Sequence, residues 1–328
     1  MSETDSSQPV ENAAETATDE PVAGPAPVDS AFPGWLNRLP ASARPYGLLS
    51  RIDRPVGVWL LLLPCWIGIA FTRIPDGFRF IDIGWALLFA IGAVAMRGAG
   101  CTWNDITDRD IDAGVARTAK RPIPSGQVSV RNAYFWLAAQ LAVGFLVWLL
   151  LPFDAKIVAL LALPLVAAYP FMKRITWWPQ AWLGITFNWG VFVAAATVGS
   201  VSLANVVLWL GLACWTIAYD TIYALQDRED DELMGVKSTA RLFGGRALLG
   251  ALCFHLAAAA LIALAGLAIG AGRLGAVTGL AFLAHGFWQM LRMRRDGERA
   301  ALDVFKSSVW TGAILVAGFT LSALAALT

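Results

Sequence analysis

The sequence predicts an all-α membrane protein that crosses the bilayer several times. Of its 328 residues, 57% are hydrophobic and 15% are charged, whereas an ordinary soluble protein carries roughly 25% charged residues. The segments 132–151, 180–199, 247–270 and 307–328 contain no Asp, Glu, Lys or Arg. Each segment is long enough to cross a hydrocarbon layer of about 30 Å. Soluble enzymes, nucleic-acid-binding proteins and secreted disulfide scaffolds are therefore excluded.

The N-terminal segment differs from the rest of the chain. Residues 1–30 hold seven acidic residues, no Lys or Arg, and many Ala, Pro, Ser and Thr, a composition that does not bury enough apolar surface to become ordered. They lack both the apolar run of a secretory signal and the Arg-rich character of a mitochondrial presequence. We therefore expect a disordered acidic cytoplasmic tail over 1–34 of a bacterial protein. Residues 35–54 mix Trp, Leu, Tyr and Arg, which favours an interfacial lead-in to a transmembrane domain over 55–328.

Hydropathy and the distribution of basic residues predict the topology. We expect nine spans, at about 56–72, 83–103, 132–151, 156–172, 180–199, 204–223, 247–270, 274–291 and 305–327. Nineteen of the 25 Lys and Arg residues fall on the side of the N-terminus, and three fall on the opposite side. The positive-inside rule then predicts a bacterial inner-membrane protein with a cytoplasmic N-terminus and a periplasmic C-terminus.

Acidic residues outside the tail are concentrated in two short windows. Ten of the seventeen lie in 104–112 (NDITDRDID) and 220–232 (DTIYALQDREDDE), each at the cytoplasmic end of a span. Carboxylates so close together repel one another, and polyvalent cations such as Mg²⁺ are an economical way to compensate them. Both windows are therefore expected to face the cytoplasm and to hold Mg²⁺.

The spacing of the acids suggests an internal repeat. Asn104, Asp108 and Asp112 recur every four residues, as do Asp227 and Asp231, so each set would lie along one face if its span continues as a helix. The two sets are four spans apart, which keeps their orientation. This predicts two parallel four-helix repeats plus a final helix, with the two acidic faces opposed across a central cavity.

Basic residues accompany both windows, and two charges lie inside spans. Near the windows, the side chains suited to phosphate oxygens are Lys120, Arg121, Lys173 and Lys237. Arg97 precedes Asn104 by seven residues, and Asp220 stands in the same relation to Asp227. An ionisable residue at membrane depth predicts a functional site. A structural ion pair between Arg97 and Asp220 is the alternative.

The acidic motifs resemble those of a known family. NDITDRDID is similar to the NDxxDxxxD motif of UbiA-type intramembrane aromatic prenyltransferases, and YALQDREDD is similar to their YxxxDxxxD motif. The strings RPVGVWLLLLPCW, KRPIPSGQVS, YPFMKRITWWPQ and GVKSTARLFG resemble the 4-hydroxybenzoate branch of that family. The resemblance covers about residues 50–328, and the acidic tail departs from it.

The resemblance implies a reaction and its participants. A polyprenyl group would pass from polyprenyl diphosphate to 4-hydroxybenzoate, ortho to the phenol, with release of diphosphate, in ubiquinone biosynthesis. The cofactor would be Mg²⁺, and the all-helical fold would enclose a central cavity that opens to lipid. The expected metal ligands, acting through the diphosphate, are Asn104, Asp105, Asp108, Asp112, Asp227 and Asp231.

Other residues receive expected roles from their chemistry and spacing. Tyr223 would support the second motif, and Lys120, Arg121, Lys173 and Lys237 would bind the diphosphate and neutralise its developing charge. Tyr169, four residues before Lys173, would share its face at the substrate. Asp220 would orient the phenol or accept a proton, and Arg97 would receive the acceptor carboxylate or a phosphate oxygen. Haem farnesylation by the same family and a cation-coupled membrane transporter are the alternative functions; the transporter predicts broken spans near the midplane.

Overall fold

The structure is a computed structural model that describes residues 36, 38–114 and 118–327. The tail predicted over 1–34 lies outside these residues. Within the predicted lead-in, the short helix α2 (Arg44–Leu49) is formed, with Pro45 in its first turn. The predicted domain boundaries remain predictions.

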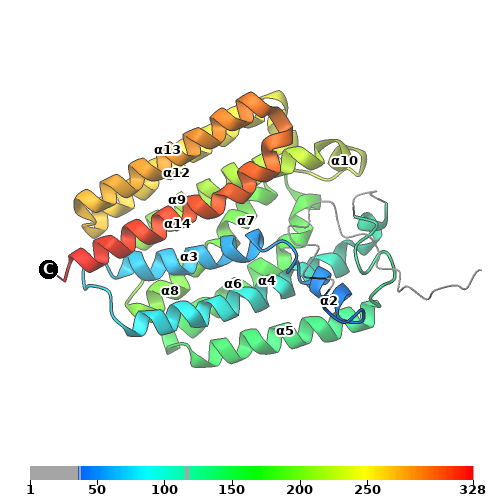
Figure 1. Cartoon of the computed structure of the whole chain (residues 1–328), viewed down its shortest axis with the longest axis horizontal. Helices are drawn as coiled ribbons and strands as arrows, with labels where there is room; N and C mark the ends of the chain where they lie inside the picture. The colour runs from blue at the N-terminus through cyan, green and yellow to red at the C-terminus, as the bar shows by residue number, and fades with distance from the viewer. Residues whose placement is uncertain (1–35, 37, 115–117, 328) are drawn as a thin grey trace, which may run out of the picture.

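Throughout the described residues, every regular element is a helix, which confirms the all-α fold. After α2, the α-helices are α3 (Val56–Thr72), α4 (Ile81–Ala113), α5 (Val130–Leu150), α6 (Phe153–Ile175), α7 (Pro179–Phe187), α8 (Gly190–Val198), α9 (Leu203–Tyr223), α10 (Arg228–Leu233), α11 (Thr239–Phe243), α12 (Ala247–Ile269), α13 (Gly272–Asp296) and α14 (Ala301–Ala325). The 3₁₀ turns are η1 (Ala224–Asp227), η2 (Gly244–Arg246) and η3 (Gly297–Ala300). The long helices lie side by side lengthwise, with α2 and α10 at one end and the C-terminus at the other (Figure 1).

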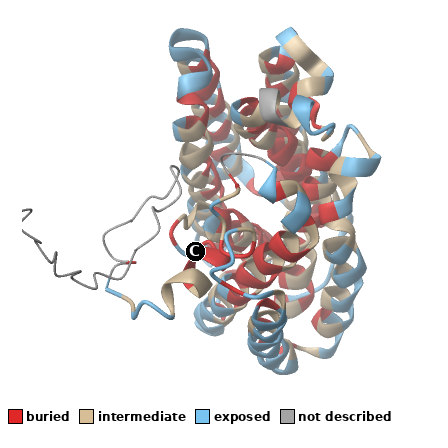
Figure 2. Cartoon of the chain, turned by 90° about the vertical axis from the view of Figure 1, so that its right-hand side faces the viewer, coloured by how far each residue is buried: buried red, intermediate tan, exposed pale blue. Residues whose placement is uncertain are grey.

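The outer faces of the bundle are apolar. Leu87 on α4, Phe135 on α5 and Leu280 on α13 are each more than 60% exposed, and exposed residues cover the outward faces of the helices while buried ones lie between them (Figure 2). Apolar side chains on this scale face lipid rather than water. The protein is therefore a multi-pass membrane protein.

The predicted number of nine spans is not confirmed. Within the described residues, seven helical stretches are long and apolar enough to cross a membrane. Two features of the fold cause the difference. Helix α3 has 17 residues, and α13 and α14 belong to one continuous helical stretch, Gly272–Ala325, that turns back at η3. The four-helix repeat also remains a prediction.

One predicted span is broken in the middle. Helix α7 ends at Phe187 and α8 begins at Gly190. Asn188 lies in the break, is 1% exposed, and donates from Nδ2 to Gly184 O (2.8 Å) and to Thr216 Oγ1 on α9 (2.8 Å). The Asn188 amide thereby ties the break to α9 through a buried hydrogen bond.

The main core lies where α3, α9, α12 and α14 meet. Its largest fully buried side chain is Trp215 on α9, with Phe71, Phe282 and Phe319 packed in the same cluster. This apolar core occupies the middle of the bundle. Polar chemistry is consequently concentrated at the end where α2 and α10 lie, which we call the acidic end.

Candidate active site

The acidic end contains a cavity of about 410 Å³ with walls from α4, α6, α7, α9 and the segments that follow α9. A second cavity of about 170 Å³ adjoins it between α3, α7, α9 and α14. The two cavities share Arg54, Arg97, Tyr169, Phe187, Asp220 and Tyr223. Sequence segments more than 100 residues apart thus line one continuous polar region.

The first acidic motif lies on α4, which continues ten residues beyond the predicted end of its span. Asn104, Asp105 and Asp112 line the cavity. Asp108 does not line it, contrary to the prediction. Its fully buried carboxylate instead accepts hydrogen bonds from Lys173 Nζ (2.5 Å) and Arg174 Nη2 (2.9 Å) at the C-terminal end of α6.

Asp105 and Asp112 belong to a second charged network. Both oxygens of Asp105 accept hydrogen bonds from Arg51 Nη2, at 2.7 and 3.0 Å, and Asp105 is fully buried. Arg121 Nη1 lies 2.6 Å from Asp112 Oδ2 and 3.4 Å from Asp105 Oδ1. The role of Asp105 as a metal ligand remains a prediction, and in the structure its carboxylate is paired with Arg51. Arg121 joins Asp105 to Asp112 in the cavity wall.

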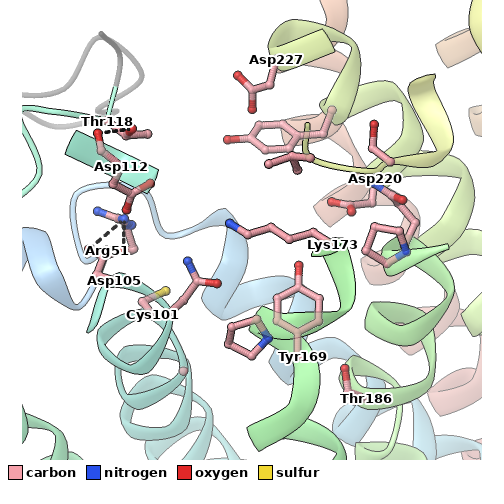
Figure 3. Close-up of a pocket in the computed structure, with 18 of the residues that line it drawn as sticks. Arg51, Cys101, Asp105, Asp112, Thr118, Tyr169, Lys173, Thr186, Asp220 and Asp227 are labelled. Atoms are coloured by element: carbon pink, nitrogen blue, oxygen red, sulfur yellow. Dashed lines mark hydrogen bonds and ion pairs between the residues drawn. The ribbon is translucent and has the colours of Figure 1, made fainter. Parts of the chain in front are cut away.

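The second acidic motif faces the first across the cavity. Tyr223, Asp227 and Asp231 all line it, and Figure 3 shows Lys173 reaching into the space between Asp227 and the Asp105–Asp112 group. The regular spacing predicted for this motif is interrupted, since α9 ends at Tyr223 and the 3₁₀ turn η1 precedes α10. Asp227 therefore does not lie on a continuous α-helix with Asp231. The ring of Tyr223 packs on Phe305, with centroids 4.3 Å apart.

Three of the four predicted phosphate-binding cations line the cavity. Arg121, Lys173 and Lys237 do so, whereas Lys120 is exposed and is not among the lining residues. The role of Lys120 remains a prediction; in the turn over 118–120, Thr118 is the residue that lines the cavity wall. Sequence proximity alone placed Lys120 at the site.

A hydrogen-bonded corner connects the two halves of the site. The Lys237 main-chain N–H donates to Lys173 O (2.9 Å), and its Nζ donates to Ile175 O (3.1 Å). The Thr239 main-chain N–H donates to Gln180 Oε1 (3.0 Å). The segment after the second motif is therefore fixed to the C-terminal end of α6 and the start of α7. The same end of α6 carries Lys173, which binds Asp108. Here Arg241 also donates to Val236 O and stacks over Trp177.

Arg97 and Asp220 lie deeper, and both line both cavities. The alternative ion pair between them does not form in the described residues, because no nitrogen–oxygen distance within 4.0 Å joins them. Arg97 Nε is buried without a hydrogen-bond partner, and its Cζ lies 5.5 Å from the centroid of the Phe187 ring. Tyr169 lines the same region, and its role at the substrate remains a prediction.

The donor set fits Mg²⁺ bound together with a phosphate ligand. Among the described residues, no group of three or more His, Cys, Asp or Glu side chains is arranged to hold a metal ion on its own. The cavity instead offers separated hard oxygen donors, from Asn104 and Asp112 on one side and Asp227 and Asp231 on the other. Because Mg²⁺ commonly takes one or two carboxylates plus substrate phosphates, these residues fit a metal–diphosphate complex.

Sequence reasoning missed Arg51 and Arg54 as site residues. Arg51 precedes α3 and has φ = 55°, the one non-glycine residue with positive φ in the described chain. Both residues lie close to a span and were assigned only to the basic residues that orient the protein. Their clustering in RIDRP was the available signal, but it does not distinguish a membrane-facing cation from one that points inward.

An integral membrane bundle with two acidic motifs around one polar cavity defines the class of this protein. Residues 61–325 match the UbiA prenyltransferase family, and the chain belongs to that family. The resemblance of the acidic motifs is thereby confirmed.

Relatives of known name are mitochondrial. The chain is 50% identical over 211 residues to "4-hydroxybenzoate polyprenyltransferase, mitochondrial" of Drosophila melanogaster, covering 64% of this chain and 53% of that protein. The Arabidopsis thaliana protein of the same name is 40% identical, covering 88% and 71%, and that of Saccharomyces cerevisiae is 38% identical, covering 85% and 76%. The chain spans about half the length of the first of these curated relatives.

Solved structures of family members share the fold. The apo structure of a UbiA homolog from Aeropyrum pernix K1 superposes with a TM-score of 0.68 at 30% identity, covering 80% of this chain and 97% of that one. A UbiA homolog from Archaeoglobus fulgidus, bound to GPP and Mg²⁺, gives a TM-score of 0.62 at 21% identity, covering 86% and 99%.

The predicted location is contradicted by the relatives. We expected a bacterial inner-membrane protein, whereas the three curated relatives named above are mitochondrial enzymes of eukaryotes. The distribution of basic residues predicts on which side of the membrane each loop lies, but it does not distinguish one membrane from another. Residues 1–30, whose composition argued against a mitochondrial presequence, lie outside the described residues. The multi-pass membrane character is confirmed.

Proposed function

We propose that this protein transfers a polyprenyl group from polyprenyl diphosphate to 4-hydroxybenzoate, with Mg²⁺ as cofactor, in ubiquinone biosynthesis. The single observation that supports this most strongly is the pairing of two acidic motifs with phosphate-suited cations around one cavity. The names of the relatives support the choice of acceptor.

The diphosphate would lie between the two motifs. Mg²⁺ would be held by Asn104, Asp112, Asp227 and Asp231, and when bound it withdraws charge from the leaving diphosphate. Lys173, Lys237 and Arg121 line the same space and would neutralise the negative charge that develops as the carbon–oxygen bond breaks. Asp108 would act indirectly, through its hold on Lys173 and Arg174.

The acceptor would lie deeper, near Arg97 and Asp220. The Arg97 guanidinium would bind the carboxylate of 4-hydroxybenzoate, since its planar fork matches a carboxylate. Asp220 would orient the phenol or take the proton that leaves the ring once its ortho carbon has bonded to the allylic carbon. Tyr169 and the apolar walls would exclude water, which would otherwise capture the allylic cation.

The transporter alternative has one structural feature in its favour. The break between α7 and α8 is of the kind that transporters place near the membrane midplane. The acids and bases nevertheless lie at one end of the bundle around two adjoining cavities, and the chain belongs to a prenyltransferase family.

The test is a reconstitution of the purified chain in liposomes with a polyprenyl diphosphate. We expect Mg²⁺-dependent formation of prenylated 4-hydroxybenzoate with one diphosphate released per product. Protohaem in place of 4-hydroxybenzoate serves as the comparison acceptor. Product from protohaem alone, or cation uptake into the liposomes without product, would reject the proposal.

A further inference from the structure

The guanidinium of Arg97 lies in a slot formed by two other helices. Gly57, in the first turn of α3, is so close that a Cβ atom there would stand 2.4 Å from Arg97 Nε and 2.6 Å from Nη2. Phe187, the last residue of α7, presents its ring 5.5 Å from Arg97 Cζ. All three residues line the second cavity. The slot thus depends on the missing side chain at position 57.

Arg97 is half-buried in this slot, and one of its guanidinium N–H groups is left without a partner. Its Nε is buried and has no hydrogen-bond partner, and within the described residues the guanidinium makes no direct ion pair. A buried N–H group without a partner is costly, and the cation–π contact with Phe187 offsets only part of that cost. A ligand that supplies an anion to this position therefore gains binding energy that no protein group already satisfies.

We propose that Gly57 is a positioning residue for Arg97, and that it sets the affinity for the anionic group of the acceptor. The backbone of α3 at Gly57 limits where the guanidinium rests, so its fork stays directed into the cavity. A methyl group at position 57 overlaps three guanidinium atoms, and the flexible arginine side chain moves away before the helix backbone does. This inference rests on the proposed function, in which Arg97 binds the acceptor carboxylate.

The test is a double-mutant cycle with Gly57→Ala, Arg97→Lys and the double variant, reconstituted in liposomes. We expect Gly57→Ala to raise the KM for 4-hydroxybenzoate about tenfold, because a charge-assisted hydrogen bond is lost. The donor KM and kcat stay near those of the parent. Arg97→Lys has a similar effect, and the double variant is no worse than either single variant, since both changes remove the same interaction.

Gly84→Ala is the matched control. Gly84 lies on α4, as Arg97 does, and a Cβ atom at position 84 meets nothing within 4 Å. This variant should match the parent in both KM values. A double variant whose acceptor KM rises about a hundredfold, as two independent effects would combine, overturns the proposal. Loss of kcat in Gly57→Ala with both KM values unchanged also overturns it.

Phe187→Leu provides a second route if Gly57→Ala does not accumulate in the membrane. Leucine removes the aromatic ring that contacts the Arg97 guanidinium on its other side. Phe187→Leu should therefore raise the acceptor KM, and its effect should be non-additive with that of Arg97→Lys. Unchanged KM values for both substrates overturn the proposal. If a non-additive rise is found in the donor KM instead, the slot still positions Arg97, and the carboxylate assignment in the proposed function is the part that fails.

Discussion

Lys173 and Asp108 form a short ion pair, with Nζ 2.5 Å from Oδ2 and the carboxylate fully buried. Lys173 also lines the cavity in which the diphosphate is proposed to bind. Lys173 therefore has one partner within the protein, Asp108, and a second, proposed partner in the substrate, the diphosphate. A diphosphate that draws on Lys173 competes with Asp108 for it.

Asp108→Asn should lower turnover about tenfold or more, because the amide no longer fixes Lys173 and Arg174 by charge-assisted bonds. The same variant should bind inorganic pyrophosphate more tightly in the absence of Mg²⁺, since both cations lose their internal carboxylate. Turnover with the natural pair of substrates and calorimetric titration with pyrophosphate measure the two effects. Parent-like values in both experiments would contradict the competition.

Removal of divalent metal should abolish product formation. In the proposed function, Mg²⁺ lies between the diphosphate and the carboxylates of Asp227 and Asp231, which would repel the diphosphate once the metal is removed. Activity should return when Mg²⁺ is restored, and Ca²⁺ should restore less, because it prefers more ligands and longer bonds. The measurement is product formed after treatment with a chelator. Full activity in the presence of excess chelator would show that the acidic motifs act without metal.

Arg51→Ala should destabilise the protein by about 3–5 kcal/mol, since it leaves the buried Asp105 carboxylate without its principal partner. Thermal unfolding in detergent measures the loss. Arg109→Ala is the control: its ion pair with Asp110 is exposed on both sides, and exposed pairs contribute little. Equal melting temperatures for the two variants would mean that Asp105 is not dependent on Arg51.

Gly286→Ala should destabilise the helix pair α12–α13. A Cβ atom at position 286 overlaps the imidazole of His255, which is buried and stacked on Phe282 with ring centroids 4.7 Å apart. Overpacking of this kind costs about 1–3 kcal/mol, and sometimes more. Gly279→Ala on the same helix adds its methyl group in open space and should leave the melting temperature unchanged. The comparison is made by thermal unfolding in detergent.

The sequence predicts the long helices well because the position and length of each apolar segment determine where a membrane-spanning helix forms. The segment expected at 56–72 coincides with α3, and the one expected at 247–270 coincides with α12 to within one residue. The break at Asn188 is not predictable in the same way, since a polar amide in an apolar run is compatible with a continuous helix. Its partner Thr216 lies 28 residues further along the chain.

For the candidate site, the sequence predicts which residues gather but not how they pair. Asn104, Asp112 and Asp227 line the cavity as expected. The regular spacing predicts that Asp108 lines the cavity with them. In the structure, Asp108 instead pairs with Lys173 and Arg174 of α6 and does not line the cavity. Arg51, which pairs with Asp105, has a backbone φ of 55°, a conformation that is uncommon for residues other than glycine and that spacing does not reveal.

The bond from the Lys237 main-chain N–H to Lys173 O uses backbone atoms alone. Any amino acid except proline supplies that N–H. Relatives can therefore change the side chain at this position, and with it the charge presented to a substrate, without shifting the segment that follows Asp231. At this corner the backbone keeps its shape, whereas the side chain at position 237 is open to variation in charge.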